Sequence, residues 1–236
     1  MLKIPKIIHQ IWIGPNPIPQ KFIDTWLNYC KKYKWEHKLW RDQDVLSLLN
    51  KYPENIKLFN AESSWQGKAD IARYHFMYEF GGFYFDADQV WLGKLSIESL
   101  LSNISGDFIG TQEFPDPIIL NIDPPFIANS AFACTPYHPI LKRTITGLVD
   151  QYNKNDKNTP AAFKTGPKYL NNSIKEPIIV LPYWYFFPID FRKPTNVKLD
   201  DILSYDKYPN SLAFTFNGGE VNLGVSQTGG GMSNLQ

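Results

Sequence analysis

Apolar and polar positions at the start of the chain follow the order of strand, helix and strand. Residues 6–13 form a β-branched and mostly apolar run that Gly14-Pro15 stops, which predicts a buried strand. Between Pro19 and Tyr33 the apolar residues recur at helical spacing, and residues 37–40 are again typical of a strand. This order indicates a βαβ unit and therefore a mostly parallel sheet flanked by helices.

A further helix is expected to begin after Ser63-Ser64, which can cap it, and to end at Gly81. Asp70 and Arg73 lie three residues apart on this helix, and we expect them to share an exposed stripe. The apolar positions that define the helix recur every three or four residues: Ala69, Ala72, Phe76 and Phe80.

The next apolar run, residues 83–85, ends in two carboxylates, Asp86 and Asp88, with Ala87 between them. A strand that is apolar throughout and then acidic must leave the core at its carboxyl end, where open α/β sheets bind ligands. Neighbouring carboxylates repel each other, and a hard divalent cation that bridges them to phosphate oxygens relieves the repulsion. The motif therefore indicates a metal and phosphate site, although an acidic pair in a solvated turn is the plainer interpretation.

The composition is compatible with this prediction of an α/β protein. Hydrophobic residues make up 43% and charged residues 20% of the 236 positions, as in an ordinary globular protein. We expect one domain, residues 1–236. The formal net charge of +1 argues against a nucleic-acid partner, because nucleic-acid-binding modules usually concentrate basic residues.

Cellular location is indicated only by weak signals. Two cysteines, Cys30 and Cys134, are no disulfide framework for a chain of this size, which favours a reducing compartment. No stretch approaches the roughly 20 apolar residues of a membrane span. We therefore expect a cytoplasmic protein without a transmembrane segment, and a peripheral contact with a membrane stays open.

The rest of the chain is less regular. Residues 108–110 suggest another strand, and the aromatic segment 183–187 is expected to belong to the core. Gly218-Gly219 and the glycines at 229–231 predict a flexible end, either a lid that orders over a ligand or a frayed terminus.

Three blocks of the sequence, residues 4–14, 68–74 and 81–88, resemble in this order the DXD-type glycosyltransferases. That family includes fungal initiating mannosyltransferases, inositol phosphoceramide mannosyltransferases, capsular polysaccharide enzymes and, more distantly, the glucosylating clostridial toxins. Asn129, His138-Pro139, Thr165-Gly166-Pro167 and residues 184–188 are similar to weaker landmarks downstream.

The resemblance implies a GT-A glycosyltransferase fold, with residues 1–90 as the nucleotide-sugar half and 91–236 as the acceptor side and C-terminal lid. It also implies a Mn²⁺ or Mg²⁺ ion and transfer with retention at the anomeric carbon. Trp12 would stack on the nucleotide base, although core packing explains it equally well. By the same resemblance the catalytic residues are Asp70, Arg73 and Asp88, the donor-binding residues are Ile11, Trp12, Asp70, Arg73, Tyr84 and Asp86, and the metal ligands begin with Asp86 and Asp88.

The carboxyl end departs from the family pattern. Many relatives carry a late His followed by a Ser-Trp pair, whereas residues 213–222 here read Ala-Phe-Thr-Phe-Asn-Gly-Gly-Glu-Val-Asn. Glu220 and Asn222 offer oxygen ligands on this stretch, and we expect them to complete the metal site.

The resulting hypothesis is a metal-dependent retaining glycosyltransferase that moves a hexose to a glycan, glycolipid or protein hydroxyl. The donor is UDP-glucose, UDP-galactose, UDP-GlcNAc or GDP-mannose, with a UDP-hexose favoured. Two alternatives stay open. One is a phosphohydrolase of the haloacid dehalogenase type with Asp86 as its nucleophile, and the other is a non-catalytic sugar-binding module.

Overall fold

The computed structural model describes residues 3–115, 126–156, 158–190, 197–204 and 207–216. Their helices and strands run, in chain order, as β1 (Ile7–Ile11), α1 (Gln20–Tyr33), β2 (Glu36–Trp40), α2 (Asp42–Leu49), α3 (Pro53–Ala61), α4 (Trp65–Phe80), β3 (Gly82–Phe85), β4 (Gln89–Trp91), α5 (Ile97–Leu100), β5 (Phe108–Gln112), β6 (Ile127–Cys134), α6 (Pro139–Asn153), α7 (Ala161–Lys164), α8 (Pro167–Ser173), β7 (Ile179–Leu181), the 3₁₀ turn η1 (Tyr183–Tyr185), α9 (Leu199–Ser204) and β8 (Ala213–Thr215).

A six-stranded sheet in the order β2-β1-β3-β6-β5-β7 forms the centre of the molecule. β1 is parallel to β2 and β3, and β5 is parallel to β7, which confirms the predicted mostly parallel sheet. β6 alone runs against its neighbours β3 and β5 in this sheet. As a result β1, β3 and β5 all finish at one edge of the sheet, and β6 begins there; we call this edge the carboxyl edge.

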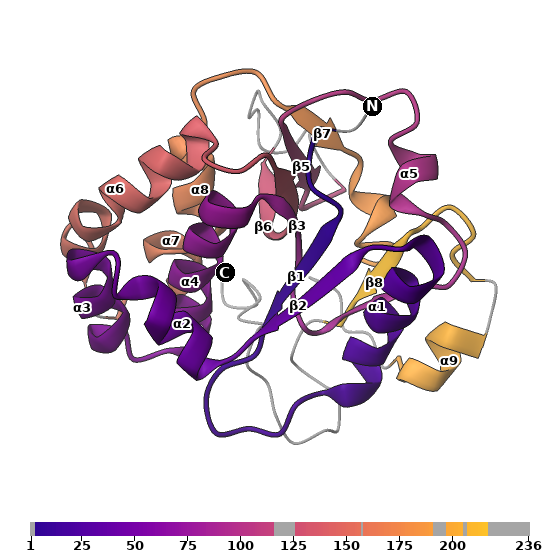
Figure 1. Cartoon of the computed structure of the whole chain (residues 1–236), viewed down its shortest axis with the longest axis horizontal. Helices are drawn as coiled ribbons and strands as arrows, with labels where there is room; N and C mark the ends of the chain where they lie inside the picture. The colour runs from indigo at the N-terminus through magenta and orange to yellow at the C-terminus, as the bar shows by residue number, and fades with distance from the viewer. Residues whose placement is uncertain (1–2, 116–125, 157, 191–196, 205–206, 217–236) are drawn as a thin grey trace.

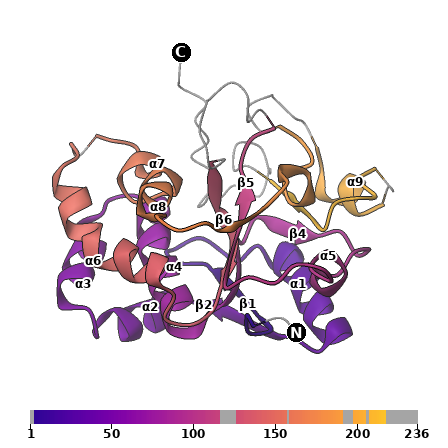
Figure 2. The ribbon, with the colours of Figure 1, turned by 90° about the horizontal axis from the view of Figure 1, so that it is seen from above.

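Helices cover both faces of the sheet (Figure 1). α2, α3, α4, α6, α7 and α8 lie on one face, whereas α1, α5 and the small β4-β8 sheet lie on the other, and Figure 2 shows the same two layers from above. Alternation along β3 matches these layers: Tyr84 packs in the cluster on the α4 side, and Phe83 and Phe85 pack in the cluster with Trp26 of α1. The core therefore holds β3 firmly from both faces.

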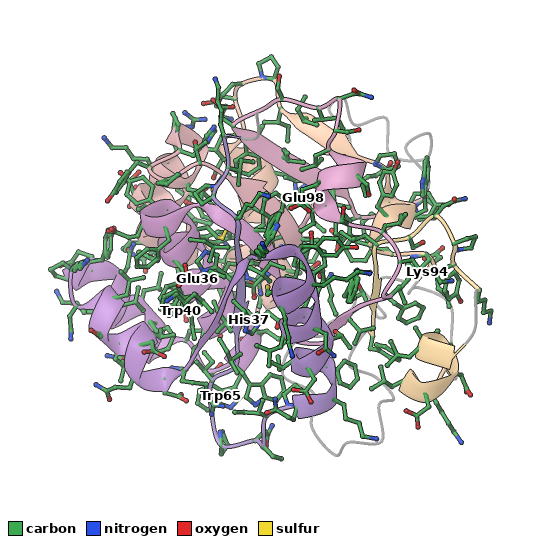
Figure 3. The ribbon with its side chains drawn as sticks, turned by 45° about the vertical axis from the view of Figure 1, so that its right-hand side comes forward. Glu36, His37, Trp40, Trp65, Lys94 and Glu98 are labelled. Atoms are coloured by element: carbon green, nitrogen blue, oxygen red, sulfur yellow. The ribbon has the colours of Figure 1, made fainter. Side chains whose placement is uncertain are left out.

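Glu98 of α5 forms hydrogen bonds with α1 and with the start of the chain. Its Oε1 accepts hydrogen bonds from Lys6 Nζ at 2.9 Å and Trp35 Nε1 at 2.6 Å, and its Oε2 accepts one from Tyr29 at 3.0 Å. Figure 3 labels Glu98 together with Glu36, His37 and Trp40 of the neighbouring edge strand β2. Residues of α1 pack beneath the carboxyl edge. The hydrogen bonds of Glu98 therefore help to fix the position of α1 under that edge.

The two thiols are buried and free, with Cys30 in α1 and Cys134 at the end of β6. The aromatic segment after β7 is only partly core: Phe186 and Phe187 are each 4% exposed, but Trp184 is 44% exposed. Within the described ranges, each helix is either too short or too polar to cross a membrane.

Local sequence signals explain the entry into β3. The Ser64 hydroxyl accepts a hydrogen bond from the backbone N–H of Gly67 at 3.1 Å, so it caps α4 as predicted, and the helix ends at Gly81. Gly81 has φ +60° and Gly82 has φ +98°, which a residue with a side chain rarely adopts. This turn connects α4 directly to β3, the strand that Asp86 follows.

Replacing Gly81 with Ala is expected to lower the free energy of unfolding by about 3 kcal/mol or more, because a Cβ would add steric overlap to backbone strain. The added atom would lie 2.6 Å from Pro136 Cδ. Gly93 is the matched control, since it has φ +84° but nothing within 4 Å of an added Cβ. Its Ala variant should lose only about 1–2 kcal/mol. Urea denaturation of both variants measures the difference, and equal losses would exclude the overlap with Pro136.

Candidate functional site

Polar side chains from several elements gather at the carboxyl edge of the sheet. Trp12 follows β1, Asp86 follows β3 and Glu113 follows β5, while Asn129 lies near the start of the reversed strand β6. The helix α4 also borders this group: it packs on the sheet and carries Arg73 among its buried residues. The sheet topology therefore brings together residues that are far apart in the sequence.

Arg73 is the centre of a buried ionic cluster with Asp70 and Asp86. Its Nη2 lies 3.1 Å from Asp86 Oδ1 and 3.4 Å from Asp70 Oδ1, and its Nη1 donates a hydrogen bond to the backbone oxygen of Asn129 at 2.8 Å. The guanidinium also lies 4.6 Å from the ring centre of Tyr84. One arginine thus neutralises only one of two carboxylates, which leaves an excess of negative potential for a cationic ligand.

The prediction that Asp70 and Arg73 share an exposed stripe was wrong, because they are only 6% and 3% exposed. All residues from Ala69 to Met77 are buried, since α4 has the sheet on one side and neighbouring helices around the rest. The short spacing indicated that the two side chains are neighbours, but not that both lie inside the protein.

Asp70 is held in place by several donors. Asn129 Nδ2 donates to Asp70 Oδ1 at 2.8 Å, and Thr165 Oγ1 donates to Asp70 Oδ2 at 3.0 Å. Tyr74 in turn donates to the backbone oxygen of Thr165 at 2.8 Å. Asn129 and Thr165, which the sequence offered only as weak landmarks, therefore belong to the same cluster as Asp70.

The two buried carboxylates differ from ordinary surface acids. Burial raises the pKa of Asp70 to about 6, although the positive charge of Arg73 opposes the shift. Burial likewise raises the pKa of Asp86, again against the effect of Arg73. Burial also works against the charge on Arg73, but the carboxylates outweigh it and raise the Arg73 pKa. The arginine consequently stays charged.

The Asp86-Ala87-Asp88 turn joins β3 to β4 and is fixed by its backbone. Asp86 N donates to Ser130 O at 3.0 Å, and Gln10 Nε2 donates to Asp86 O at 3.2 Å. Tyr84 donates to Asp86 Oδ1 at 2.8 Å, so that oxygen is shared between Tyr84 and Arg73. Asp86 is buried, whereas Asp88 is half-buried, which suits Asp88 better for reaching a bound ion.

Trp12 lies against this turn. It is 3% exposed, packs with Ile23 and with Ala87, and its Nε1 donates to Asn16 O at 3.0 Å. Core packing therefore explains much of its burial, while the contact with Ala87 places the ring beside the acidic pair. The neighbouring Ile11 has its side chain in the core cluster.

Glu113 is a residue of this edge that the sequence analysis missed. Its side chain is half-buried, but Oε2 is shielded from solvent and receives no hydrogen bond from the described residues. Burial, and then the charge of Asp86, raise the pKa of Glu113 to about 8. No motif marks this position; the available signal was a carboxylate directly after a strand, as at Asp86.

Metal ligands are only partly defined by the described ranges. Within them, no three His, Cys, Asp or Glu side chains cluster as a metal site would require. Asp86 and Asp88 supply the hard oxygen chemistry that Mn²⁺ or Mg²⁺ prefers, so this donor pair fits such an ion, with phosphate and water oxygens left to complete it. Glu220 and Asn222, and the glycines at 218–219 and 229–231, lie outside the described residues.

Comparisons with known proteins agree with this geometry. Residues 19–109 match a family described as the glycosyltransferase sugar-binding region containing the DXD motif. Inositol phosphoceramide mannosyltransferase 1 of Schizosaccharomyces pombe is 30% identical over 197 residues, which is 77% of this chain and 57% of that protein. An uncharacterized glycosyltransferase of Acanthamoeba polyphaga mimivirus, L373, is 30% identical over 178 residues, or 73% of this chain and 65% of that protein.

A solved structure shares the fold. The PaToxG glycosyltransferase superposes with a TM-score of 0.54 at 20% sequence identity, over 73% of this chain and 69% of that one, which confirms the expected GT-A type of architecture. The chain spans 57% and 65% of the two curated relatives named above. Residues 19–109 therefore match the sugar-binding region of the DXD-type glycosyltransferases, and the chain is similar to glycosyltransferases over 73–77% of its length.

Proposed function

We propose that the protein is a divalent-metal-dependent retaining glycosyltransferase that transfers a hexose from a nucleotide-sugar to a hydroxyl of a glycan, glycolipid or protein. The observation that carries the proposal is the Asp86-Ala87-Asp88 turn, which follows β3 at the carboxyl edge and is anchored to Arg73. Residues 1–90 form the donor half in this proposal, and residues 91–236 form the acceptor side and a C-terminal lid.

Asp88 and Asp86 are the residues that hold the ion, with Glu220 and Asn222 proposed as further ligands. When bound, the ion neutralises the charge that develops on the departing diphosphate. Asp86 has a second task in the proposal, because its Oδ1 is shared by Arg73 and Tyr84 and so fixes the turn. Asp88 is left as the principal direct ligand.

Arg73 and Asp70 act on the donor sugar in this proposal. Each carboxylate oxygen accepts about two hydrogen bonds, and Asp70 Oδ2 receives one from Thr165. That oxygen consequently has capacity for a sugar hydroxyl. Trp12, packed on Ala87, supports the nucleotide base, and Tyr84 supports the donor site by holding Asp86.

The reaction needs no covalent intermediate on the protein. The bond between the anomeric carbon and the phosphate oxygen breaks, and the acceptor oxygen bonds to the same face of that carbon. The leaving phosphate takes the proton of the acceptor hydroxyl, so charge and atoms balance. Preorganised charge is commonly the largest catalytic contribution in such a site.

Two classes of donor compete in this proposal. The sequence favours a UDP-hexose, whereas two Schizosaccharomyces pombe relatives are named inositol phosphoceramide mannosyltransferases 1 and 3. These names favour a mannosyl donor and a lipid-linked acceptor for this chain as the competing choice. Both choices use the same metal and diphosphate chemistry.

The phosphohydrolase alternative fits the geometry less well. A nucleophilic aspartate must present a carboxylate oxygen in line with phosphorus, whereas Asp86 Oδ1 is already shared by Tyr84 and Arg73. The topology and relatives likewise support sugar transfer.

A panel of UDP-glucose, UDP-galactose, UDP-GlcNAc and GDP-mannose tests the proposal. We expect one donor to be hydrolysed slowly to its nucleoside diphosphate in the presence of Mn²⁺ and not in the presence of EDTA. Calorimetry on the same donors separates the alternatives: metal-assisted binding without hydrolysis would indicate a sugar-binding module. Neither binding nor hydrolysis of any donor would overturn the proposed function.

A further inference from the structure

Glu113 is placed by the fold at the same edge as the proposed metal turn. β5 is parallel to β3, with β6 between them, so both strands end at the carboxyl edge. The ends of β3 and β5 are separated by two strand spacings, which is roughly 10 Å. A hexose linked to a diphosphate can bridge this distance. The backbone N–H of Glu113 donates to Phe126 O at 3.0 Å, so pairing with the start of β6 fixes the position of the residue.

The carboxyl group of Glu113 differs from the other acids of this edge in its hydrogen bonding. Oε2 is shielded from solvent and receives no hydrogen bond from any described residue. Buried polar atoms nearly always have a partner, so an unpartnered one calls for an explanation such as bound water, an ion or a ligand. The other acids of the site, Asp70 and Asp86, by contrast already have several donors.

The carboxyl group of Glu113 has the hydrogen-bonding capacity that a sugar hydroxyl needs. A carboxyl oxygen accepts a hydrogen bond from a hydroxyl whether or not the group carries a proton. Burial raises the pKa of Glu113, which agrees with the shielded position of Oε2.

We propose that Glu113 is a donor-sugar-contacting residue, which forms a hydrogen bond with a hydroxyl of the transferred hexose. The proposal rests on the proposed function and adds to it a residue on β5, two strands away from the metal turn. It assigns recognition of the sugar, as distinct from the nucleotide, to the end of this strand.

Binding of two ligands by the Glu113→Ala and Glu113→Gln variants tests this assignment. The probes are the nucleotide-sugar that the wild-type protein hydrolyses and the corresponding nucleoside diphosphate, each measured by calorimetry with Mn²⁺. We expect Glu113→Ala to weaken donor binding at least tenfold and nucleoside diphosphate binding less than twofold, with Glu113→Gln between wild type and Ala. The matched control is Asp107→Asn, because Asp107 precedes the same strand at the opposite edge and has a 69% exposed side chain.

Deoxygenated donors provide a second measurement that a merely structural role would not change. The wild-type protein should lose at least tenfold in kcat/KM on one of the 2-, 3-, 4- or 6-deoxy donors. Glu113→Ala should show less than a twofold further loss on that same donor, because the hydrogen bond is already absent. Full additive losses on every deoxy donor would overturn the proposal.

The remaining outcomes are equally decisive. If the wild-type protein hydrolyses a donor and both Glu113 variants bind it within twofold of wild type, the assignment of Glu113 fails while the proposed function stands. A change in the Mn²⁺ requirement with unchanged discrimination between donor and nucleoside diphosphate would make Glu113 a metal ligand and overturn its contact with sugar. A wild-type protein that binds no donor overturns both proposals.

Discussion

Asp88→Asn is expected to lower Mn²⁺-dependent donor hydrolysis by roughly 10²–10³-fold, the range found when one preorganised electrostatic contact to a transition state is removed. The change keeps the size and shape of the side chain but removes the negative charge that holds a hard cation. Since Asp88 is half-buried and its backbone oxygen still accepts from Phe216 N at 3.1 Å, the variant should fold normally. The measurement is kcat/KM as a function of Mn²⁺ concentration.

Two further variants make this result interpretable. Asp88→Ala should behave like Asp88→Asn, because both lack the charge, whereas Asp107→Asn should keep wild-type activity and Mn²⁺ dependence. Thermal unfolding of each variant checks that the fold is intact. Retained turnover in both Asp88 variants at the wild-type Mn²⁺ requirement would remove the metal assignment from this turn.

Arg73→Met is expected to cost about 3–5 kcal/mol in the free energy of unfolding, the usual effect of removing one partner of a buried ion pair. Asp70 and Asp86 would then face each other inside the protein without the guanidinium that now lies 3.4 and 3.1 Å from them. The hydrogen bond from Arg73 to Asn129 O would also be lost. Urea denaturation at neutral pH measures the change.

A solvent-exposed ion pair supplies the control for this prediction. Lys57 and Glu54 lie 2.9 Å apart with side chains 71% and 68% exposed, so Lys57→Met should cost less than about 1 kcal/mol. The double variant Arg73→Met with Asp86→Asn should recover part of the stability, because it removes one of the two uncompensated charges. A loss below about 1 kcal/mol in Arg73→Met would show that the cluster is not a stabilising ion pair.

The predicted pieces of secondary structure agree with the structure wherever the signal is local. The strand stopped by Gly14-Pro15, the helix up to Tyr33 and the Ser64-capped helix ending at Gly81 all lie within a few residues of their expected bounds. Periodicity, capping hydroxyls and glycines with positive φ act between neighbours in the chain, so one sequence is sufficient to reveal them. The acidic end of β3 was predicted in the same way.

What the sequence determined by itself is therefore the order of strands and helices, the entry into β3 and the presence of two carboxylates at its end. The burial of Arg73 and the partners of Asp70 were decided by tertiary structure, because Asn129 and Thr165 are 59 and 95 positions away from Asp70. Glu113 joined the site only because β6 is reversed and brings β5 parallel to β3. Contacts of this kind depend on how the sheet is assembled, and hydrophobic periodicity within a segment carries no information about its neighbours in that sheet.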